Sequence, residues 1–268
     1  MIDTPPAPVT APLNYLLHLA DNAVVLGQRN AEWCGHGPVL EEELALANMS
    51  LDLIGQARLL YQQVATRLGG GATEDTLAYF RDVPEFRNYT LLELPHRGPL
   101  VGYAKCDMDY STTIARNFLY SAFMAPLWQQ LQACGDSVLA AIAAKSLKEA
   151  TYHLRHARDW LVRLGDGTDE SHARMQAAIL HLMPYTQEYW TVSALEQETL
   201  QAGIHIDSTQ LAADWNALVD DALREATLVR PSASGYVTQG KTGLHSEHLG
   251  FLLAEMQSLA RAHPGATW

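Results

Sequence analysis

Residues 40–68, LEEELALANMSLDLIGQARLLYQQVATRL, contain the pattern that decides the fold class. Apolar residues in this stretch recur at spacings of three, four or seven: Leu40, Leu44, Ala47, Leu51, Ile54 and Tyr61. This spacing places them on one face of an α-helix, which has 3.6 residues per turn. Three glycines, Gly69–Gly71, follow, and glycine ends helices because it readily adopts a left-handed backbone conformation. The stretch therefore predicts one long helix over Leu40–Leu68.

Helical patterns also account for most of the remaining chain. They cover Leu13–Asn30, a short helix that starts at Thr73, Val101–Ala133 bent by Pro126, a helix capped by Asp136 or Ser137 that runs to Leu164, Thr168–Gln201 with Pro184 inside it, Ser208–Thr227 and Leu244–His263. No segment combines strand-like alternation with turn signals. Two pairs of long helices joined by a crossover predict an all-α fold, a ferritin-like four-helix bundle with additional C-terminal helices. We expect a flexible Pro-rich leader over residues 1–12 and a single domain over residues 13–268.

Composition excludes several classes of protein. The 268 residues include 18 Lys and Arg against 30 Asp and Glu, which gives a formal net charge of −12. Phosphate backbones repel such an acidic chain, so we expect no nucleic-acid partner. No apolar stretch is long enough to span a membrane, and no basic residue before Arg29 marks a signal peptide. Three widely spaced cysteines, Cys34, Cys106 and Cys134, argue against a disulfide framework, so we expect a cytoplasmic protein.

One segment near the C-terminus matches a nucleotide-binding motif letter for letter. Gly235–Thr242, GYVTQGKT, satisfies GxxxxGK[ST], in which backbone N–H groups and the lysine hold phosphates. That motif works between a buried strand and a helix N-terminus, whereas residues 223–234 are polar and interrupted by Pro231. We therefore predict a turn-rich connection here, and a nucleotide-binding protein that uses Lys241 is an alternative.

The bundle centre is where a di-iron site would lie in this fold. Ferritin-like di-iron proteins take a lone carboxylate from each of two helices and a Glu-x-x-His pair from each of the other two. Here the residue three before His153 is Ala150, and the matching slots on the second helix hold Leu53 and Gln56. Alanine and leucine offer no donor atom to iron, so we predict a buried, hydrogen-bonded polar cluster instead. A metal-dependent oxidase with an atypical ligand set, Asp52, Glu149 and His153, is the alternative.

Two further groups of residues have spacings that are compatible with ligand or partner contact. His245 and His248 lie three apart at a helix start, which allows a shared metal but supplies no third ligand. Four basic residues recur at helical spacing on another helix: Lys145, Lys148, Arg155 and Arg158. Such a face either is solvated or docks an acidic partner or a phosphate-bearing ligand.

Several stretches together resemble a known family. They are residues 30–38 (NAEWCGHGP), 44–48 (LALAN), 51–58 (LDLIGQAR), Lys148-Glu149 with residues 152–155 (YHLR), 243–250 (GLHSEHLG), 253–257 (LAEMQ), and the closing Pro264-Gly265 and Trp268. They are similar to the C subunits of bacterial ring-1,2-phenylacetyl-CoA epoxidases, also called phenylacetate-CoA oxygenases. The resemblance extends over nearly the whole chain beyond the leader.

The resemblance implies a structural subunit without a cofactor of its own, paired with the related catalytic A component of the epoxidase, which holds a di-iron centre. An NADPH-dependent reductase and a bridging subunit complete that multicomponent oxygenase, which acts in aerobic phenylacetate degradation. The ligand positions of the catalytic component fall, in this chain, near Ala23, Leu53, Gln56, Ser121, Ala150 and His153. Possible interface or CoA-proximal residues are Lys145, Lys148, Arg155, Arg158, Lys241, His245 and His248. We expect the helices Leu13–Asn30 and Leu40–Leu68 to contribute to the interface.

Overall fold

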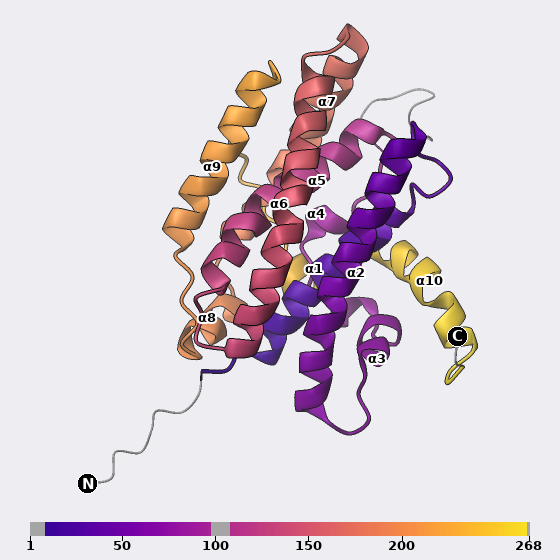
Figure 1. Ribbon diagram of the computed structural model, residues 1–268, viewed down its shortest axis with the longest axis vertical. Helices are drawn as coiled ribbons and strands as arrows, with labels where there is room; N and C mark the ends of the chain where they lie inside the picture. Colours follow the sequence, from indigo (N-terminus) through magenta and orange to yellow (C-terminus); the bar gives the residue numbers. More distant parts are fainter. Residues whose placement is uncertain (1–8, 98–107, 267–268) are drawn as a thin grey trace.

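Four long helices form the centre of the fold as two antiparallel pairs (Figure 1). The computed structural model describes residues 9–97 and 108–266. The first pair is α1 (Leu13–Ala31) and α2 (Leu40–Leu68), and the second is α5 (Tyr110–Leu131) and α6 (Ser137–Gly165). This arrangement confirms the predicted all-α, ferritin-like four-helix bundle. The described ranges contain no β-strand, only an isolated bridge between Gln239 and Leu244.

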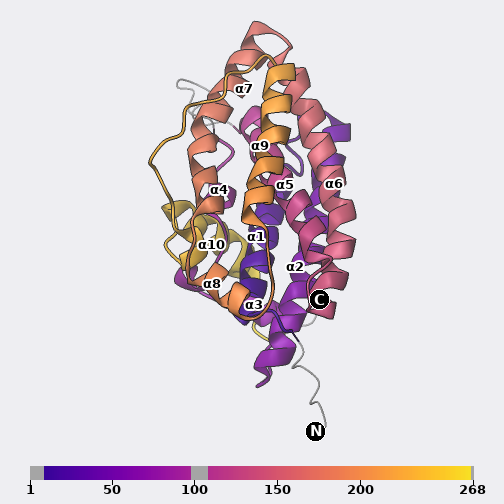
Figure 2. The same ribbon diagram turned by 90° about the vertical axis from the view of Figure 1, so that its left-hand side faces the viewer.

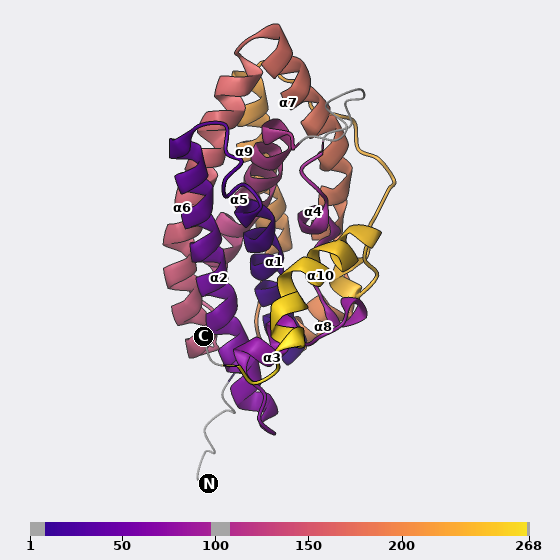
Figure 3. The same ribbon diagram turned by 90° about the vertical axis from the view of Figure 1, so that its right-hand side faces the viewer.

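Shorter elements cross between the two pairs or follow them. The crossover contains α3 (Glu74–Tyr79), η1 (Val83–Glu85) and α4 (Thr90–Glu93). The C-terminal elements are α7 (Asp169–Leu182), η3 (Met183–Trp190), α8 (Ala194–Gln201), α9 (Ser208–Glu225), η4 (Gly240–Thr242) and α10 (Glu247–Ala262). The two side views show α9 and α10 on opposite flanks of the bundle (Figure 2, Figure 3). None of the helices described here is long and apolar enough to cross a membrane.

Most helix boundaries follow their capping signals. α2 has the predicted bounds, and its C-cap residue Gly69 adopts a φ of 65°, a conformation that favours glycine. Asp136 caps α6, because its carboxylate accepts hydrogen bonds from two backbone N–H groups at 3.0 Å. α5 was predicted from Val101 but begins at Tyr110, where Asp109 caps it. The predicted residues 101–107 lie outside the described part of the chain.

The single helix predicted over Thr168–Gln201 is wrong. α7 ends at Leu182, and a 3₁₀ segment with Pro184 near its start follows, since proline lacks the N–H that an α-helix needs. A new helix, α8, then begins after Ser193, which forms a capping box with Glu196. The break turns the chain toward the start of α1, where α8 packs.

The predicted flexible leader is also too long. Residues 1–8 lie outside the described part, but Ala11 is buried. Its N–H donates to the Asp136 carboxylate at 2.8 Å, and its carbonyl accepts from Arg67 at 2.6 Å. Ala11 is therefore packed into the fold before α1 begins, tied to the end of α2 and to the start of α6.

α2 has two apolar faces rather than one. The buried face packs into the bundle and consists of Leu46, Met49, Leu53, Leu60 and Val64. Four members of the stripe quoted above point outward instead, with 43% to 67% of their surface exposed: Leu40, Leu44, Leu51 and Ile54. We call these four residues the α2 stripe. An exposed apolar row of this length is typical of a surface that another protein covers.

A buried carboxylate at Asp21 connects the first helix pair to the crossover. Asp21 is fully buried on α1, and its carboxylate accepts from the hydroxyl of Tyr61 at 2.5 Å and from the guanidinium of Arg81. It also accepts from the backbone N–H of Arg87 at 2.7 Å. The carbonyl of Arg81 in turn accepts from Gln257 of α10 at 3.0 Å. The carboxylate of Asp21 thus connects α1, α2 and the crossover directly, and it connects α10 through Arg81.

His18, one turn before Asp21, makes the fold sensitive to acid. Burial lowers its pKa to about 4 from an ordinary 6.5. Its Nδ1 lies 2.7 Å from the carbonyl oxygen of Arg87, and its Nε2 lies 3.2 Å from the amide of Asn22. Between pH 6.5 and 4 the unfolded chain binds a proton that the folded chain does not. Stability is therefore lost as the pH falls through this window, by about 3 kcal/mol for His18 alone.

Urea unfolding at a series of pH values from 7.5 to 4.5 measures this loss. We expect His18→Gln to flatten the dependence of the unfolding free energy on pH relative to the unmodified chain. His36→Gln is the matched control, because His36 is exposed, and it should leave the slope unchanged. An equal slope in the His18 variant would contradict the assignment.

Candidate functional site

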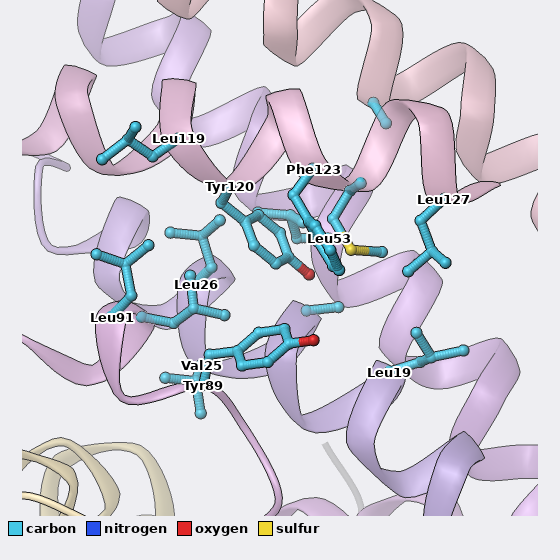
Figure 4. Close-up of a cluster of buried hydrophobic side chains, with 14 of the residues drawn as sticks. Leu19, Val25, Leu26, Leu53, Tyr89, Leu91, Leu119, Tyr120, Phe123 and Leu127 are labelled. Carbon is cyan, nitrogen blue, oxygen red and sulfur yellow. The ribbon is translucent and has the colours of Figure 1, made fainter. Parts of the chain in front are cut away.

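All six positions expected to correspond to di-iron ligands lie inside the four-helix bundle. They come from the four bundle helices: Ala23 from α1, Leu53 and Gln56 from α2, Ser121 from α5, and Ala150 and His153 from α6. Each is at most 4% exposed. Leu53 lies among the buried apolar side chains of the core, with Tyr120 and Phe123 of α5 (Figure 4). The helices therefore place these residues where a metal centre of this fold would be, but three of them are purely apolar.

Polar side chains join α2 to α6 in three bridges, which we call the polar seam. The bridges are Glu42–His156 at 2.9 Å, Asp52–His153 at 3.0 Å and Gln56–Glu149 at 2.9 Å. Residue numbers rise on one helix as they fall on the other, because α2 and α6 are antiparallel. Asp52, Gln56, Glu149 and His153 are hydrogen-bonded as predicted, but they form separate pairs rather than one centre, and Asp52 is not buried, since 38% of its side chain is exposed. Each side chain of the seam finds a partner without a metal.

The alternative ligand set of Asp52, Glu149 and His153 does not converge. Asp52 is bonded to His153, whereas Glu149 accepts from Gln56 and lies 3.3 Å from the ammonium of Lys145. A lysine ammonium at this position competes with any cation for the carboxylate. Within residues 9–97 and 108–266, no group of three or more His, Cys, Asp or Glu side chains is arranged to hold a metal ion.

Two polar contacts of the bundle were missed from the sequence. Asn30 of α1 and Asn117 of α5 exchange reciprocal amide hydrogen bonds at 2.9 Å, and both are buried. Glu42 also accepts from the hydroxyl of Tyr110 at 2.5 Å, which adds α5 to the polar seam. The i,i+3 spacing of His153 and His156 was a usable signal for the seam, since it places both on one side of α6. The asparagine pair has no local signal.

Lys241, one of the candidate ligand-contacting residues near the C-terminus, has a structural role. The ammonium of Lys241 is buried and bonds to the carbonyl of Thr191 and to the carboxylate of Glu196. A Cβ at Gly240 would lie 2.5 Å from the carbonyl oxygen of Asn88, so this glycine is needed for close packing. The proposed contact of Lys241 with CoA, or with a nucleotide, is therefore wrong, because its charge is already neutralised inside the protein.

The two C-terminal histidines do not form a pair. The side chain of His245 is 1% exposed and contacts Glu93 at 2.8 Å and the carbonyl oxygen of Phe86 at 2.9 Å. The carbonyl of His248 accepts from Arg29 at 3.4 Å. His245 therefore fixes the start of α10 to the crossover and is unavailable to a partner, while His248 is partly exposed.

The basic residues of α6 divide into two groups. Lys145, Lys148 and Arg155 are exposed, so they are available to a partner as predicted. Arg158 instead pairs with Asp221 at 2.7 Å and with Glu225 at 2.6 Å, which attaches α9 to α6. Arg158 is only partly exposed, and its guanidinium is already paired within the chain, so it is less available to a partner than the other three.

Comparison with known proteins identifies the family. A family model described as "Phenylacetic acid catabolic protein" matches residues 3–268. The chain belongs to the phenylacetic acid catabolic protein family. It is 46% identical over 254 residues to the C subunit of the 1,2-phenylacetyl-CoA epoxidase of Escherichia coli (strain K12), with 95% of this chain and 98% of that protein covered. The resemblance to the C subunits is thus confirmed, and phenylacetate catabolism is the process in which this member of the family acts.

A di-iron centre does not fit this member of the phenylacetic acid catabolic protein family. A hard, oxidisable iron pair needs oxygen and imidazole donors that converge, and Leu53, Ala23 and Ala150 place methyl and methylene groups there. Gln56 and His153, the side chains at these positions with the amide and imidazole groups, are hydrogen-bonded within the polar seam. At these positions the described side chains therefore supply buried packing and hydrogen bonds rather than a set of converging metal ligands.

Proposed function

We propose that this chain is a non-catalytic structural subunit of a phenylacetyl-CoA 1,2-epoxidase. It pairs with the di-iron A component of that enzyme, which we call the catalytic partner, and the NADPH-dependent reductase and the bridging subunit complete the complex. The observation that supports this most strongly is the apolar filling of the ligand positions: Leu53 is 2% exposed within the aromatic and aliphatic core. A site of this kind holds no iron, so the chain contributes to the reaction through its surface.

The α2 stripe supports the choice of that surface. A stable protein interface needs about 800 Å² on each partner with an apolar centre and a polar rim. The stripe offers the apolar centre, and exposed Lys145, Lys148 and Arg155 on neighbouring α6 offer a basic rim. α2 is thus favoured as the contact with the catalytic partner.

α1, which was expected to share in this contact, is unsuited to it. Along its whole described length only Asn14 is exposed, because α1 is enclosed by α2, the crossover and the C-terminal helices. We therefore assign the interface to α2 and α6.

Elemental analysis tests the absence of a metal centre. The chain purified from iron-rich medium is expected to hold less than about 0.1 iron per molecule, because the described residues contain no set of converging donors. The catalytic partner, purified in parallel, should retain its iron and serves as the control. Near-stoichiometric iron that disappears in His153→Ala would contradict the proposal and favour the oxidase built on Asp52, Glu149 and His153.

Reconstitution tests the function itself. Epoxidation of phenylacetyl-CoA by the catalytic partner, with the reductase and NADPH supplied, is expected to depend on this chain. His153→Ala should support turnover as well as the unmodified chain, since His153 takes no part in chemistry. Full turnover by the catalytic partner without this chain would overturn the proposal.

A further inference from the structure

A cavity of about 580 Å³ lies between the bundle and the C-terminal helices. Its wall is built from the start of α1, the end of α5, η3, α8 and the start of α9, whose arrangement is visible in Figure 2. The polar seam lies between α2 and α6, so this cavity is a separate feature. Its volume falls in the range of about 300–1,000 Å³ that small-molecule sites occupy.

Aromatic rings form the inner wall of the cavity. Phe123 and Tyr189 stack with ring centres 4.3 Å apart, and Tyr89 meets Tyr189 edge-on at 4.7 Å. Trp190 continues this wall beside Phe123 at 5.6 Å. Figure 4 shows Tyr89 and Phe123 next to Leu127, which also lines the cavity. Faces and edges of several rings in one wall favour a flat aromatic guest over an aliphatic one.

Two hydroxyl groups in this wall have no partner. The phenols of Tyr15 and Tyr189 are buried, and no hydrogen-bond acceptor or donor reaches either of them among the described residues. Burial raises the pKa of both groups well above the ordinary value, so both keep their proton and can donate it in a hydrogen bond. An unpaired buried hydroxyl is destabilising unless something supplies the missing bond.

The wall carries no free charge. His18 is neutral at pH 7, because burial lowers its pKa to about 4, and both of its ring nitrogens are hydrogen-bonded. Burial opposes ionisation of Glu196, but Lys241 holds its pKa below the ordinary value, and the two form an ion pair at 2.5 Å. A charged guest would find no counter-ion here, so an uncharged one is favoured.

The mouth of the cavity is apolar and open to solvent. Val192 and Leu200 line it, and both are among the most exposed large apolar residues of the chain. Ala212 of α9 also lines it and is partly exposed. A guest can therefore enter between α8 and α9 without unfolding the bundle.

We propose that this cavity is a binding site for an uncharged aromatic molecule with one hydrogen-bonding oxygen, the chemical class of the phenols. The ring lies against Phe123, Tyr189 and Trp190, and the oxygen satisfies the hydroxyl of Tyr15 or Tyr189. This proposal does not depend on the pairing with the catalytic partner, so a binding measurement on this chain alone tests it.

Isothermal titration calorimetry with 2-naphthol tests the site on the full chain. We expect a dissociation constant of roughly 10–100 µM for a guest of this size. Cyclohexanol and benzoate should bind at least about tenfold more weakly, because one lacks the ring and the other is charged. No heat of binding from 2-naphthol at millimolar concentration would overturn the proposal, as would equal affinity for benzoate.

Substitutions locate the guest. Ala212→Trp fills the cavity from α9 and should weaken 2-naphthol binding by at least about tenfold. Ala213→Trp, one position along on the exposed face, is the matched control and should bind as the unmodified chain does. Equal affinity in the two variants would place the guest elsewhere and overturn the proposal.

Tyr15→Phe and Tyr189→Phe keep the rings and remove the unpaired hydroxyls, so they test the site even if Ala212→Trp fails to fold. At least one of them should weaken 2-naphthol binding by roughly threefold to tenfold while leaving naphthalene binding unchanged. An unaltered affinity for 2-naphthol in both would overturn the role of the hydroxyls.

Discussion

Replacing Asp21 with alanine is expected to lower the free energy of unfolding by about 3–5 kcal/mol, the usual result of removing one partner of a buried ion pair. The guanidinium of Arg81 would remain buried with its carboxylate gone, stacked over the ring of Phe86 at 4.3 Å. Tyr61 and the N–H of Arg87 would lose their acceptor as well. Total stabilities of single domains are about 5–15 kcal/mol, so this change is large.

Urea denaturation followed by circular dichroism measures this effect. Asp159→Ala is the matched control, because Asp159 lies exposed on α6, and it should change stability by less than about 0.5 kcal/mol. We also expect α10 to loosen first in the Asp21 variant, since Gln257 depends on the carbonyl of Arg81. Hydrogen exchange should show faster amide exchange in α10. A loss below about 1 kcal/mol would show that Asp21 does not hold these segments together.

The double substitution Leu44→Asp and Leu51→Asp is expected to weaken binding to the catalytic partner by at least about 100-fold. Both side chains lie in the α2 stripe and are more than half exposed, at 55% and 66%. In the free chain an Asp at either position stays in water, so the substitution should change the stability of the fold little. In the complex the carboxylate would lose its water, which opposes binding. The fold should therefore remain intact while association fails.

Size-exclusion chromatography and titration with the catalytic partner measure the loss. Leu180→Asp on α7 is the control, because Leu180 is 49% exposed but lies outside the α2 stripe. It should leave the dissociation constant unchanged. Undiminished binding by the double variant would remove α2 from the interface and leave the structural role without its proposed surface.

The sequence predicted the bundle well where local signals act alone. Gly69 and Asp136 end or start a helix through their own backbone and side-chain hydrogen bonds, so the bounds of α2 and the start of α6 were predicted correctly. The apolar identity of Leu53 and Ala150 was also readable, and it is the basis of the proposal that this chain holds no iron, since neither side chain offers a donor atom to a metal. The end of α7 at Leu182 was not predicted from the sequence. A helix can accommodate a proline such as Pro184, and only Ser193 signals that a new helix, α8, begins.

Tertiary contacts set the limits of prediction. The apolar spacing of Leu44 and Leu51 correctly predicted a helix, but spacing alone does not distinguish a face that enters the core from one that faces solvent. The alternative that Lys241 binds phosphate stayed open because nothing near it in sequence reveals its partner Glu196, 45 positions earlier. The aromatic cavity combines residues from Tyr15 to Ala212 and has no sequence pattern at all.

Because the polar seam pairs amide, imidazole and carboxylate groups with one another, we expect this chain to reach its native state with no supply of iron. We expect its abundance in cells to be the same under iron starvation and iron sufficiency. A di-iron protein, by contrast, becomes competent only after metal delivery. Folded copies of this chain would then be present before the catalytic partner has received its iron. The amount of assembled enzyme would be limited by the amount of iron-containing catalytic partner.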